Sequence, residues 1–356
     1  MLTGVTTHYF LGANTYKGFY SLYDDLVDKD NDSRLFILKG GPGCGKSSFM
    51  KRIAAAVQER GKPVEMIHCS GDPDSLDAIY IPHLKTAYVD GTAPHVIEPD
   101  YPAAMEQYIN LGSFYDSDAL LPEKAKIAKT KAAYQLQYNK AYDYLAAAKN
   151  IRDAVSVDIY LAKKLAIVKR RAKGIARREL KRTQHPSGSE TRRFLSAISC
   201  TGIVQDMSAA DALCTRKFLI DNDYGLAPFL LEEIAKTALQ NGYNIISCFD
   251  PLCPELYEHI IIPELSLGFL SSYGKKTPDS KLVKRIRLDA LAMSDLGAKA
   301  KKSIRNQLKL YKAVLGESEA ALESAKKIHD ELEAIYNPHV DFDSLYELAN
   351  EHAASI

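Results

Sequence analysis

The chain has 356 residues, 46% of them hydrophobic and 26% charged, which is typical of a soluble globular protein large enough for two domains with separate cores. Its formal net charge of +1 excludes a global electrostatic field that would recruit nucleic acid or a membrane, and leaves only local patches for such partners. No apolar run approaches about 18 residues, and the first ten residues, MLTGVTTHYF, lack the features of a signal peptide. We therefore expect a cytoplasmic protein without membrane contact.

A glycine-rich loop (residues 40–47) is the most informative local pattern. A short strand is predicted near residues 9–11, and an apolar strand at 35–38 then enters the loop, from which an amphipathic helix leaves near Lys46. Gly40, Gly45, Lys46 and Ser47 fit the pattern G-x-x-x-x-G-K-[ST] of nucleotide phosphate loops. The alternative is a glycine turn that merely joins a strand to a helix.

The chemistry of phosphate binding explains these residue types. Glycines let consecutive backbone N–H groups wrap closely around an anion at the positive end of a helix. Lys46 is expected to reach the β- and γ-phosphates, and the Ser47 hydroxyl to ligate Mg²⁺. The predicted ATP-binding residues are Gly40, Gly41, Pro42, Gly43, Cys44, Gly45, Lys46, Ser47 and Ser48.

Further strands and long helices are predicted beyond the loop. Strands are expected at 64–68 and 86–89, and apolar residues at helical spacing mark a long helix around 134–148 and another around 308–332. We expect the long helices to pair into antiparallel arms. The six cysteines form no C-x-x-C pair, so neither a zinc site nor a disulfide framework is predicted from them.

Segments of the first half recur in the second, which predicts a tandem duplication. Four matches carry this inference: 10–18 with 194–202, 34–36 with 216–218, 69–73 with 248–251, and 79–82 with 260–263. Alternating strands and helices predict an α/β fold, with a P-loop-type parallel sheet and helices on both faces in each half, and a long helical arm after each. The expected domains are residues 1–183, a polar linker at 184–191, and residues 192–356.

The second half lacks the chemistry of the loop. Residues 221–229 read DNDYGLAPF, so Pro228 and Phe229 stand in place of the lysine and serine, and two aspartates would repel phosphate. We therefore expect one working nucleotide site, in the first half.

The duplication also serves as an internal control for candidate carboxylates. Asp90 ends a predicted strand, where a Mg²⁺-binding carboxylate belongs, and its counterpart is Ser271. The alternative for Asp90 is a residue that only initiates an Asp-Gly turn. Asp72 is a candidate substrate-facing carboxylate, as in small P-loop kinases, but its match with Asp250 favours a structural role. Lys46, Asp90 and Asp72 are the predicted catalytic residues, and Ser47 and Asp90 the predicted metal ligands.

Residues 163–193 form a basic arm, with twelve Lys or Arg against two Glu. Arg170 and Arg177 are seven residues apart, as are Arg171 and Arg178, so a helix would hold them along one side. Three interpretations are open: a solvated helix face, a phosphate-binding surface for nucleic acid, and a lid whose arginines close over a phosphorylated substrate.

The segments FLGANTYKGF, LKGGPGCGKSSFM, HCSGDPDSLDAIYIP, DGTAPHVIEP and INLG resemble a bacterial family of duplicated P-loop proteins described only as ATPases or nucleotide-kinase-like proteins. The resemblance covers essentially the whole chain and implies an ATP site at residues 40–48, with Asp90-Gly91-Thr92 near the nucleotide. Relatives often keep a phosphate loop in the second half as well, and this sequence departs from that pattern.

Three functional hypotheses follow from the sequence. The first is an Mg²⁺-dependent ATPase or kinase-like phosphotransferase with one active half and one degenerate half. The second is a nucleotide-gated module whose helical arms bind a protein or nucleic acid and which turns over slowly. The third is a nucleic-acid-dependent ATPase that uses the basic arm. The sequence leaves the phosphoryl acceptor and the oligomeric state open.

Overall fold

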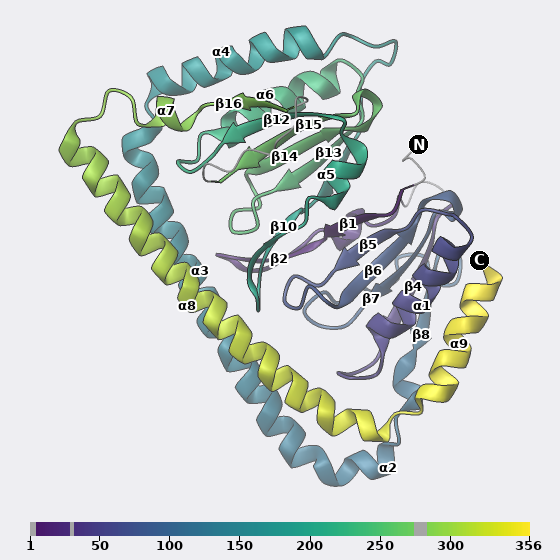
Figure 1. The fold of residues 1–356 in the computed structure, drawn as a ribbon. Coiled ribbons are helices and arrows are strands. Elements are labelled where there is room, and N and C mark those ends of the chain that lie inside the picture. The colour runs from purple at the N-terminus through teal and green to yellow at the C-terminus, as the bar shows by residue number, and fades with distance from the viewer. Residues whose placement is uncertain (1–4, 29–31, 274–282) are drawn as a thin grey trace. The chain divides into compact units, whose positions relative to one another are not determined.

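The computed structural model describes residues 5–28, 32–273 and 283–356, and the chain divides into two compact units (Figure 1). Unit 1 contains Met1–Asp143, Ser196–Asp206 and Glu317–Ile356, and unit 2 contains Tyr144–Leu195 and Met207–Gly316. Each unit is an α/β structure built on a six-stranded sheet.

The sheet of unit 1 has the strand order β1-β5-β6-β7-β4-β8. Its strands, in chain order, are β1 Thr7–Phe10, β4 Arg34–Lys39, β5 Glu65–His68, β6 Leu76–Ile81, β7 Thr86–Asp90 and β8 Glu106–Asn110. The predicted strands at 35–38, 64–68 and 86–89 are thereby confirmed.

The expectation of a parallel sheet was wrong, because β6 runs antiparallel to both β5 and β7. The connections explain this: a short turn over residues 69–75 joins β5 to β6, and the 3₁₀ turn η2 Pro82–Leu84 joins β6 to β7. Connections of this length reverse the chain, whereas a parallel crossover needs a dozen residues or more. The remaining pairs, β1 with β5, and β4 with β7 and β8, are parallel.

Two helices cover one face of this sheet as a single layer. Helix α1 Lys46–Glu59 contacts β6 and β7, and α9 Phe342–Ser355 packs on α1. Phe49 and Ile53 of α1 and Leu345 of α9 share one buried cluster with Leu38 of β4. The amphipathic pattern of α1 therefore finds its apolar partner nearly 300 residues away in the sequence.

The sheet of unit 2 has the order β16-β12-β15-β14-β13-β9. Its strands are β9 Glu190–Arg193, β12 Arg216–Asp221, β13 Ile245–Phe249, β14 Tyr257–Ile262, β15 Leu267–Ser272 and β16 Val283–Ile286. Helix α6 Ala227–Gln240 packs on this sheet, and α4 Ala162–Glu179 packs on α6. Because β9 begins at Glu190, the end of the predicted linker at 184–191 is part of a strand.

The two sheets have the same strand order when β9, β13, β14, β15, β12 and β16 are matched with β1, β5, β6, β7, β4 and β8. The register agrees as well: Leu38 of β4 pairs with Asp90, and Ile220 of β12 pairs with Ser271. Asp90 and Ser271 therefore occupy equivalent positions in their sheets, as the sequence comparison predicts.

The hydrogen bonds of the turn after β5, and of the corresponding turn after β13, correct one of the sequence matches. Cys69 N donates to Ser75 O and Ser75 N to Asp72 O, and the same pattern recurs from Asp250 N to Leu256 O and from Leu256 N to Cys253 O. Asp72 is therefore equivalent to Cys253, and not to Asp250 as the shared Asp-Pro dipeptide suggested. The two turns have equal length, and the Asp-Pro dipeptide of unit 2 lies three positions earlier in its turn than the Asp-Pro dipeptide of unit 1. Retention of Asp250 thus says nothing about Asp72.

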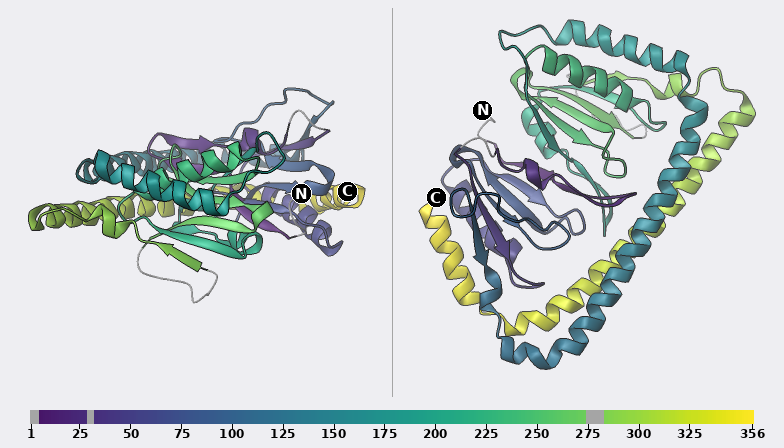
Figure 2. Two further views of the ribbon diagram at one scale, coloured as in Figure 1. Left: turned by 90° about the horizontal axis from the view of Figure 1, so that it is seen from above. Right: turned by 180° about the vertical axis from the view of Figure 1, so that it is seen from behind.

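Two long helices, α3 Lys124–Ile159 and α8 Ala298–Tyr336, form the predicted antiparallel arms (Figure 1 and Figure 2). In unit 1, Ser318 Oγ donates to Ala141 O, and the Tyr134 and His329 rings are 5.5 Å apart. Each arm continues into a helix that packs in one unit: α8 leads to α9 on α1, and α3 leads to α4 on α6. Helix α9 therefore belongs to unit 1 and α4 to unit 2, whereas the predicted boundaries of 1–183 and 192–356 assign each helix to the other half.

The remaining elements are short. They are the hairpin strands β2 Gly12–Thr15, β3 Gly18–Ser21, β10 Ser196–Ser199 and β11 Gly202–Gln205, the helices α2 Ser117–Leu120, α5 Ser208–Leu213 and α7 Asp289–Ala292, and the 3₁₀ turns η1 Tyr23–Asp25, η3 Leu111–Phe114, η4 Leu121–Glu123, η5 Pro263–Leu265 and η6 Asn337–His339. Among the described residues, no helix combines the length and apolar content needed to cross a membrane.

Candidate functional site

The glycine-rich loop lies between the carboxyl end of β4 and the first turn of α1. Gly43 and Gly45 have φ angles of +71° and +80°, a backbone conformation that side chains disfavour by about 1–2 kcal/mol per residue. Cys44 is buried between them, and burial raises the pKa of its thiol, which favours the protonated form. Ser48 is half-buried in the first turn of α1. The local sequence thus dictates a tight turn at a helix N-terminus.

Lys46 is folded back over this turn. Its Nζ donates to the carbonyls of Gly40 and Gly41, at 3.0 Å each, and lies 3.6 Å from Asp90 Oδ2. The lysine and aspartate side chains are only 12% and 13% exposed. The structure therefore brings together Lys46 and Asp90, two of the three predicted catalytic residues.

Asp90 and Ser47 hold defined orientations beside the loop. Asp90 Oδ1 accepts hydrogen bonds from the backbone N–H of Thr92, at 2.8 Å, and from its hydroxyl, at 2.5 Å. Asp90 therefore starts an Asp-Gly turn, and its second carboxylate oxygen faces Lys46. Ser47 Oγ accepts from Leu76 N at 2.9 Å, which places the hydroxyl at the start of β6. Hydroxyl and carboxylate oxygens are the donor types that Mg²⁺ prefers.

A buried ion pair between His95 and Asp77 supports Asp90. His95 Nδ1 donates to the backbone O of Asp90 at 2.9 Å, and His95 Nε2 lies 3.4 Å from Asp77 Oδ2, which also accepts from the Tyr23 hydroxyl at 2.8 Å. Burial by itself would lower the pKa of His95, but the Asp77 and Asp90 groups raise it to about 9. Burial would likewise raise the pKa of Asp77, and the charge of His95 lowers it. At neutral pH this network is an imidazolium between two carboxyl-bearing residues.

The C-terminal end of α8 covers the loop from the other side. Glu333 Oε1 accepts a hydrogen bond from Gly43 N at 3.2 Å, and the Asn337 amide is placed to donate to Gly43 O at 2.9 Å. Tyr115 donates its hydroxyl to Pro42 O at 2.7 Å. A backbone N–H of the loop thus already binds a carboxylate oxygen, the kind of partner that a phosphate oxygen would replace.

Asp72, the third predicted catalytic residue, contacts helix α8 and not the glycine-rich loop. Its Oδ2 lies 3.4 Å from Lys326 Nζ of α8, at the same side of the helix as Glu333 seven residues later. A cavity of about 550 Å³ lies beyond the C-terminal end of α8, and its lining includes Tyr115 and residues 338–341 but none of residues 40–48. The glycine-rich loop therefore lies outside that cavity.

The loop of unit 2 (residues 221–229) is closed by different contacts. Asp221 pairs with Arg285 at 2.6 Å, and Tyr160 donates its hydroxyl to Gly225 O at 2.8 Å. Phe229, which replaces the serine, packs edge-on against the Tyr160 ring at 4.9 Å. Burial, together with Asp223 and Asp221, raises the pKa of Asp289 beside this loop to about 7. The residues here are aromatic and acidic, and their chemistry does not suit a phosphate.

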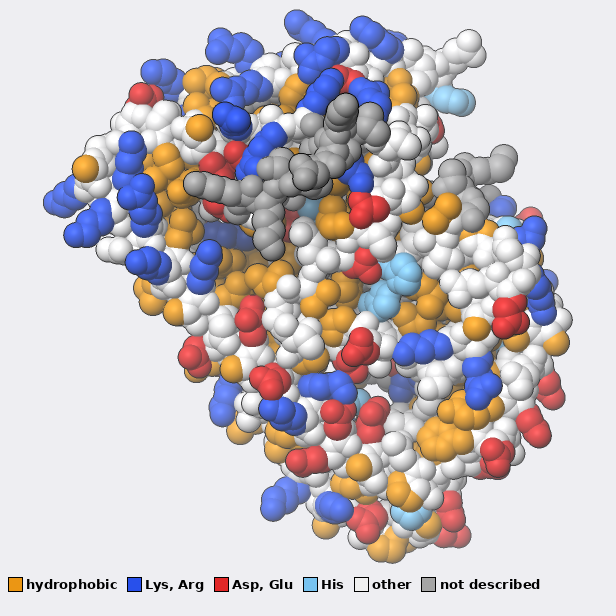
Figure 3. Space-filling model, viewed as in Figure 1, with side chains coloured by type: hydrophobic (Ala, Val, Ile, Leu, Met, Phe, Trp, Pro, Cys, Tyr) orange, Lys and Arg blue, Asp and Glu red, His pale blue; other side chains and the backbone are white. Residues whose placement is uncertain are grey.

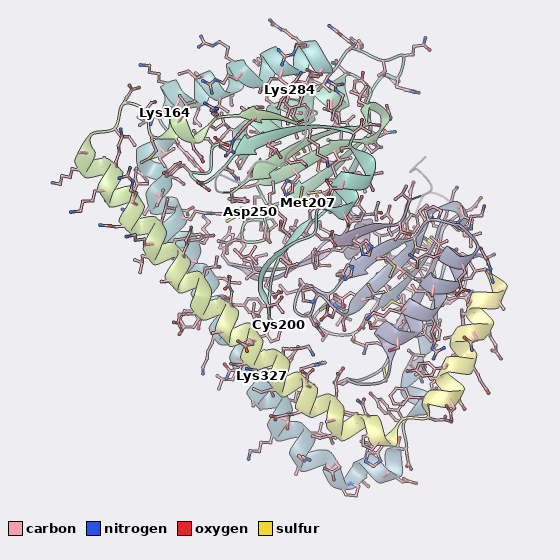
Figure 4. All side chains as sticks on the ribbon, in the orientation of Figure 1. Lys164, Cys200, Met207, Asp250, Lys284 and Lys327 are labelled. Carbon is pink, nitrogen blue, oxygen red and sulfur yellow. The ribbon has the colours of Figure 1, made fainter. Side chains whose placement is uncertain are left out.

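The basic arm forms helix α4 and the segment up to β9. Val168, Ala172 and Ala176 bury one face against α6, and Arg170, Arg171, Arg177 and Arg178 are exposed on the remainder. Lysine and arginine side chains line this edge of the molecule (Figure 3). Lys164, labelled in Figure 4, and Arg193 are exceptions, because both are buried; Lys164 Nζ donates to Ala292 O at 2.5 Å. The arm is therefore an amphipathic helix with a solvated basic face.

The sequence profile of one family, described as Nephrocystin 3, N-terminal, matches residues 20–80, a stretch that includes the glycine-rich loop, α1 and β5. Neither a curated protein nor a solved structure matched the chain.

Proposed function

We propose that this chain is an ATP-binding P-loop protein with one nucleotide site, in unit 1. The observation that carries the proposal is the geometry of residues 40–47: positive φ angles at Gly43 and Gly45, followed by a lysine whose amine lies between the loop carbonyls and Asp90. The backbone N–H groups of such a turn and the N-terminus of α1 suit a β-phosphate, and Lys46 would exchange its carbonyl partners for the β- and γ-phosphates.

The neighbouring oxygen donors suit a magnesium ion, which would neutralise phosphate charge and orient the γ-phosphate. Ser47 Oγ and Asp90 Oδ2 are the groups that we expect to hold it, with Asp90 fixed from behind by Thr92 and by His95. The chain would then act as an Mg²⁺-dependent ATPase or a kinase-like phosphotransferase, mainly by positioning and electrostatics. Asp72 has Cys253, and not an aspartate, at the equivalent position of unit 2. The argument that both halves keep this aspartate for a structural reason therefore no longer applies, and Asp72 becomes a stronger candidate for facing a substrate.

We infer that the two units derive from a tandem duplication within the bacterial family of duplicated P-loop proteins that the sequence resembles. Equal strand order and equivalent register in the two sheets support this inference. Unit 2 is then the degenerate copy, since Pro228, Phe229 and Ser271 stand where unit 1 has Lys46, Ser47 and Asp90.

A second candidate function, a nucleotide-gated binding module, is favoured by the contact between Glu333 and Gly43 N. A phosphate and a carboxylate repel each other and cannot share one N–H donor. Binding of ATP would therefore displace Glu333 and release the end of α8 and the Asn337 contact that follows it. In this proposal, a partner binds α8 differently when nucleotide is present and when it is absent.

Binding is tested with MgATP and three forms of the full-length protein: the wild type, Lys46→Ala, and the control Lys62→Ala, an exposed lysine just beyond α1. Isothermal titration should show binding to the wild type and the control, and none to Lys46→Ala. Full affinity in Lys46→Ala would overturn the site.

Turnover separates the two functions. Phosphate release is measured alone and with DNA, RNA or a panel of nucleosides as potential activators or acceptors. Negligible release throughout, with intact binding, leaves the gated module. Stimulation by nucleic acid that disappears when Arg170, Arg171, Arg177 and Arg178 are changed to Glu would instead indicate a nucleic-acid-dependent ATPase.

A further inference from the structure

A cluster of two histidines and one aspartate lies in unit 1, apart from the glycine-rich loop. His8 lies on β1, His68 at the end of β5, and Asp206 directly after β11, and all three are half-buried. One potential ligand atom from each lies within 4.8 Å of the other two. His8 Nδ1 and His68 Nε2 are 2.8 Å apart, and the rings stack with centroids 5.1 Å apart.

The sheet brings the two histidines together. In the parallel pairing of β1 with β5, His8 lies opposite Met66, two residues before His68, so both rings project from the same face. His68 is also oriented from behind, because its Nδ1 donates to Pro73 O at 2.7 Å. This bond places the ring proton on Nδ1 and directs the Nε2 lone pair toward His8, the arrangement in which backbone carbonyls orient metal-binding histidines.

We propose that His8 Nδ1, His68 Nε2 and the Asp206 carboxylate bind a divalent transition-metal ion of the Zn²⁺ type, with a fourth position open to water. Two imidazoles and one carboxylate are a donor set that suits zinc and its neighbours, whereas Mg²⁺ and Ca²⁺ prefer oxygen ligands.

In the metal-free form the two histidines share one proton, and His8 Nδ1–H donates to His68 Nε2. When the ion binds, this proton leaves Nδ1 and His8 takes up a proton on Nε2, so that both imidazoles stay neutral and both ligand nitrogens are free to bind the metal. Bonds of about 2.0–2.1 Å at tetrahedral angles place two ligand nitrogens about 3.3 Å apart, so the rings must separate by only about half an ångström.

The cluster is confined to unit 1. In the pairing of β9 with β13, Arg192 occupies the place of His8, and the register that matches Ile67 with Cys248 puts Phe249 in the place of His68. An arginine and a phenylalanine cannot ligate a metal, yet unit 2 forms the same sheet. The histidine pair is therefore not a requirement of the fold.

A short path connects the cluster to the glycine-rich loop. The turn over residues 69–75 carries Pro73, whose carbonyl accepts from the His68 ring, and it leads into Leu76 at the start of β6, whose N–H donates to Ser47 Oγ. A metal ion that fixes His68 would therefore stiffen the turn on which the Ser47 hydroxyl rests.

The test uses the full chain freed of metal by chelation, without nucleotide, so that its result is independent of the proposed ATP site. Co²⁺ is titrated in and followed by its visible absorption, which is intense in a tetrahedral site and weak in an octahedral one. Zn²⁺ is titrated by calorimetry. We expect one ion per chain, tetrahedral Co²⁺ absorption, and a thermal midpoint that rises with Zn²⁺ concentration.

Two variants and one control locate the ion. His68→Phe installs the residue that unit 2 carries, and Asp206→Asn removes the carboxylate charge with little change in shape; each should weaken Zn²⁺ binding by about a hundredfold or more. His83→Asn, at an exposed histidine of η2, should leave binding unchanged. Absence of stoichiometric binding to the wild type would refute the site. Unchanged affinity in Asp206→Asn, a variant with the wild-type sheet residues, would refute this ligand set even if His68→Phe failed to fold.

Discussion

The contact between Glu333 and the glycine-rich loop gives the sharpest prediction about nucleotide binding. Glu333→Gln removes the charge but keeps an oxygen acceptor of similar shape 3.2 Å from Gly43 N. Hydrogen bonds to charged groups stabilise by about 1.5–3 kcal/mol, and this one is long and more than a third exposed, so we take about 1–1.5 kcal/mol. Since 1.4 kcal/mol is a factor of ten, we expect the competing contact to weaken the apparent affinity for ATP about tenfold, and the variant to recover most of that factor.

The assay is calorimetric titration of MgATP into the wild type, Glu333→Gln and Glu331→Gln, an exposed glutamate two residues earlier on α8. The first variant should bind about five- to tenfold more tightly, and the control as the wild type does. A second control combines Glu333→Gln with Lys46→Ala, which should not bind. Equal or weaker binding by Glu333→Gln would show that phosphate and Glu333 do not compete for Gly43 N, and would remove the main support for nucleotide gating.

Three further changes test the surroundings of the loop. His95 has a pKa raised from 6.5 to about 9 in the folded protein, so its stabilisation is complete below pH 6.5 and is lost as the pH rises through about 9; denaturant titrations should show this loss in the wild type and not in His95→Gln. Gly45→Ala should lower the free energy of unfolding by about 1–2 kcal/mol, measured in the same way, because φ is +80° there. Leu345→Ala should cost about 2–5 kcal/mol by emptying the α1–α9 contact, whereas Val168→Ala on α4 should destabilise the protein without changing ATP affinity.

Local sequence was sufficient for the centre of the candidate site. The order of apolar residues, glycines and lysine in residues 34–56 specifies β4, the loop and α1. The preferred backbone conformation of these residues is enough to predict the strand, the turn and the start of the helix. Asp90 was found by combining a strand end with a comparison between halves, and the pairing of β4 with β7 places it beside Lys46. These predictions needed only nearby residues or an internal repeat.

Contacts between distant segments escaped the sequence analysis. Glu333 and Asn337 lie about 290 residues beyond Gly43 in the chain, on a helix whose spacing pattern indicates only that it packs somewhere. The match of Asp72 with Asp250 failed for a different reason. The sequence match was based on the shared Asp-Pro dipeptide, whereas the correct alignment follows from the hydrogen bonds of the turn, which only the structure shows. The strand β6 was not predicted from the sequence, and its antiparallel direction follows from the short turns on either side of it.

The two units together separate what the fold requires from what the loop chemistry requires. In both units the end of a long helix contacts a positive-φ glycine of the loop: Glu333 bonds to Gly43 in unit 1, and Tyr160 bonds to Gly225 in unit 2. Since this contact persists where the lysine and serine are absent, covering the loop with a helix end is a property of the fold and not evidence of regulation. The partners differ, however. In unit 2 a hydroxyl donates to a carbonyl, a contact that phosphate cannot replace, whereas in unit 1 a carboxylate accepts from an N–H, as a phosphate oxygen does. The gating proposal therefore rests on the charge of Glu333, and a change that preserves its shape while removing that charge is the decisive one.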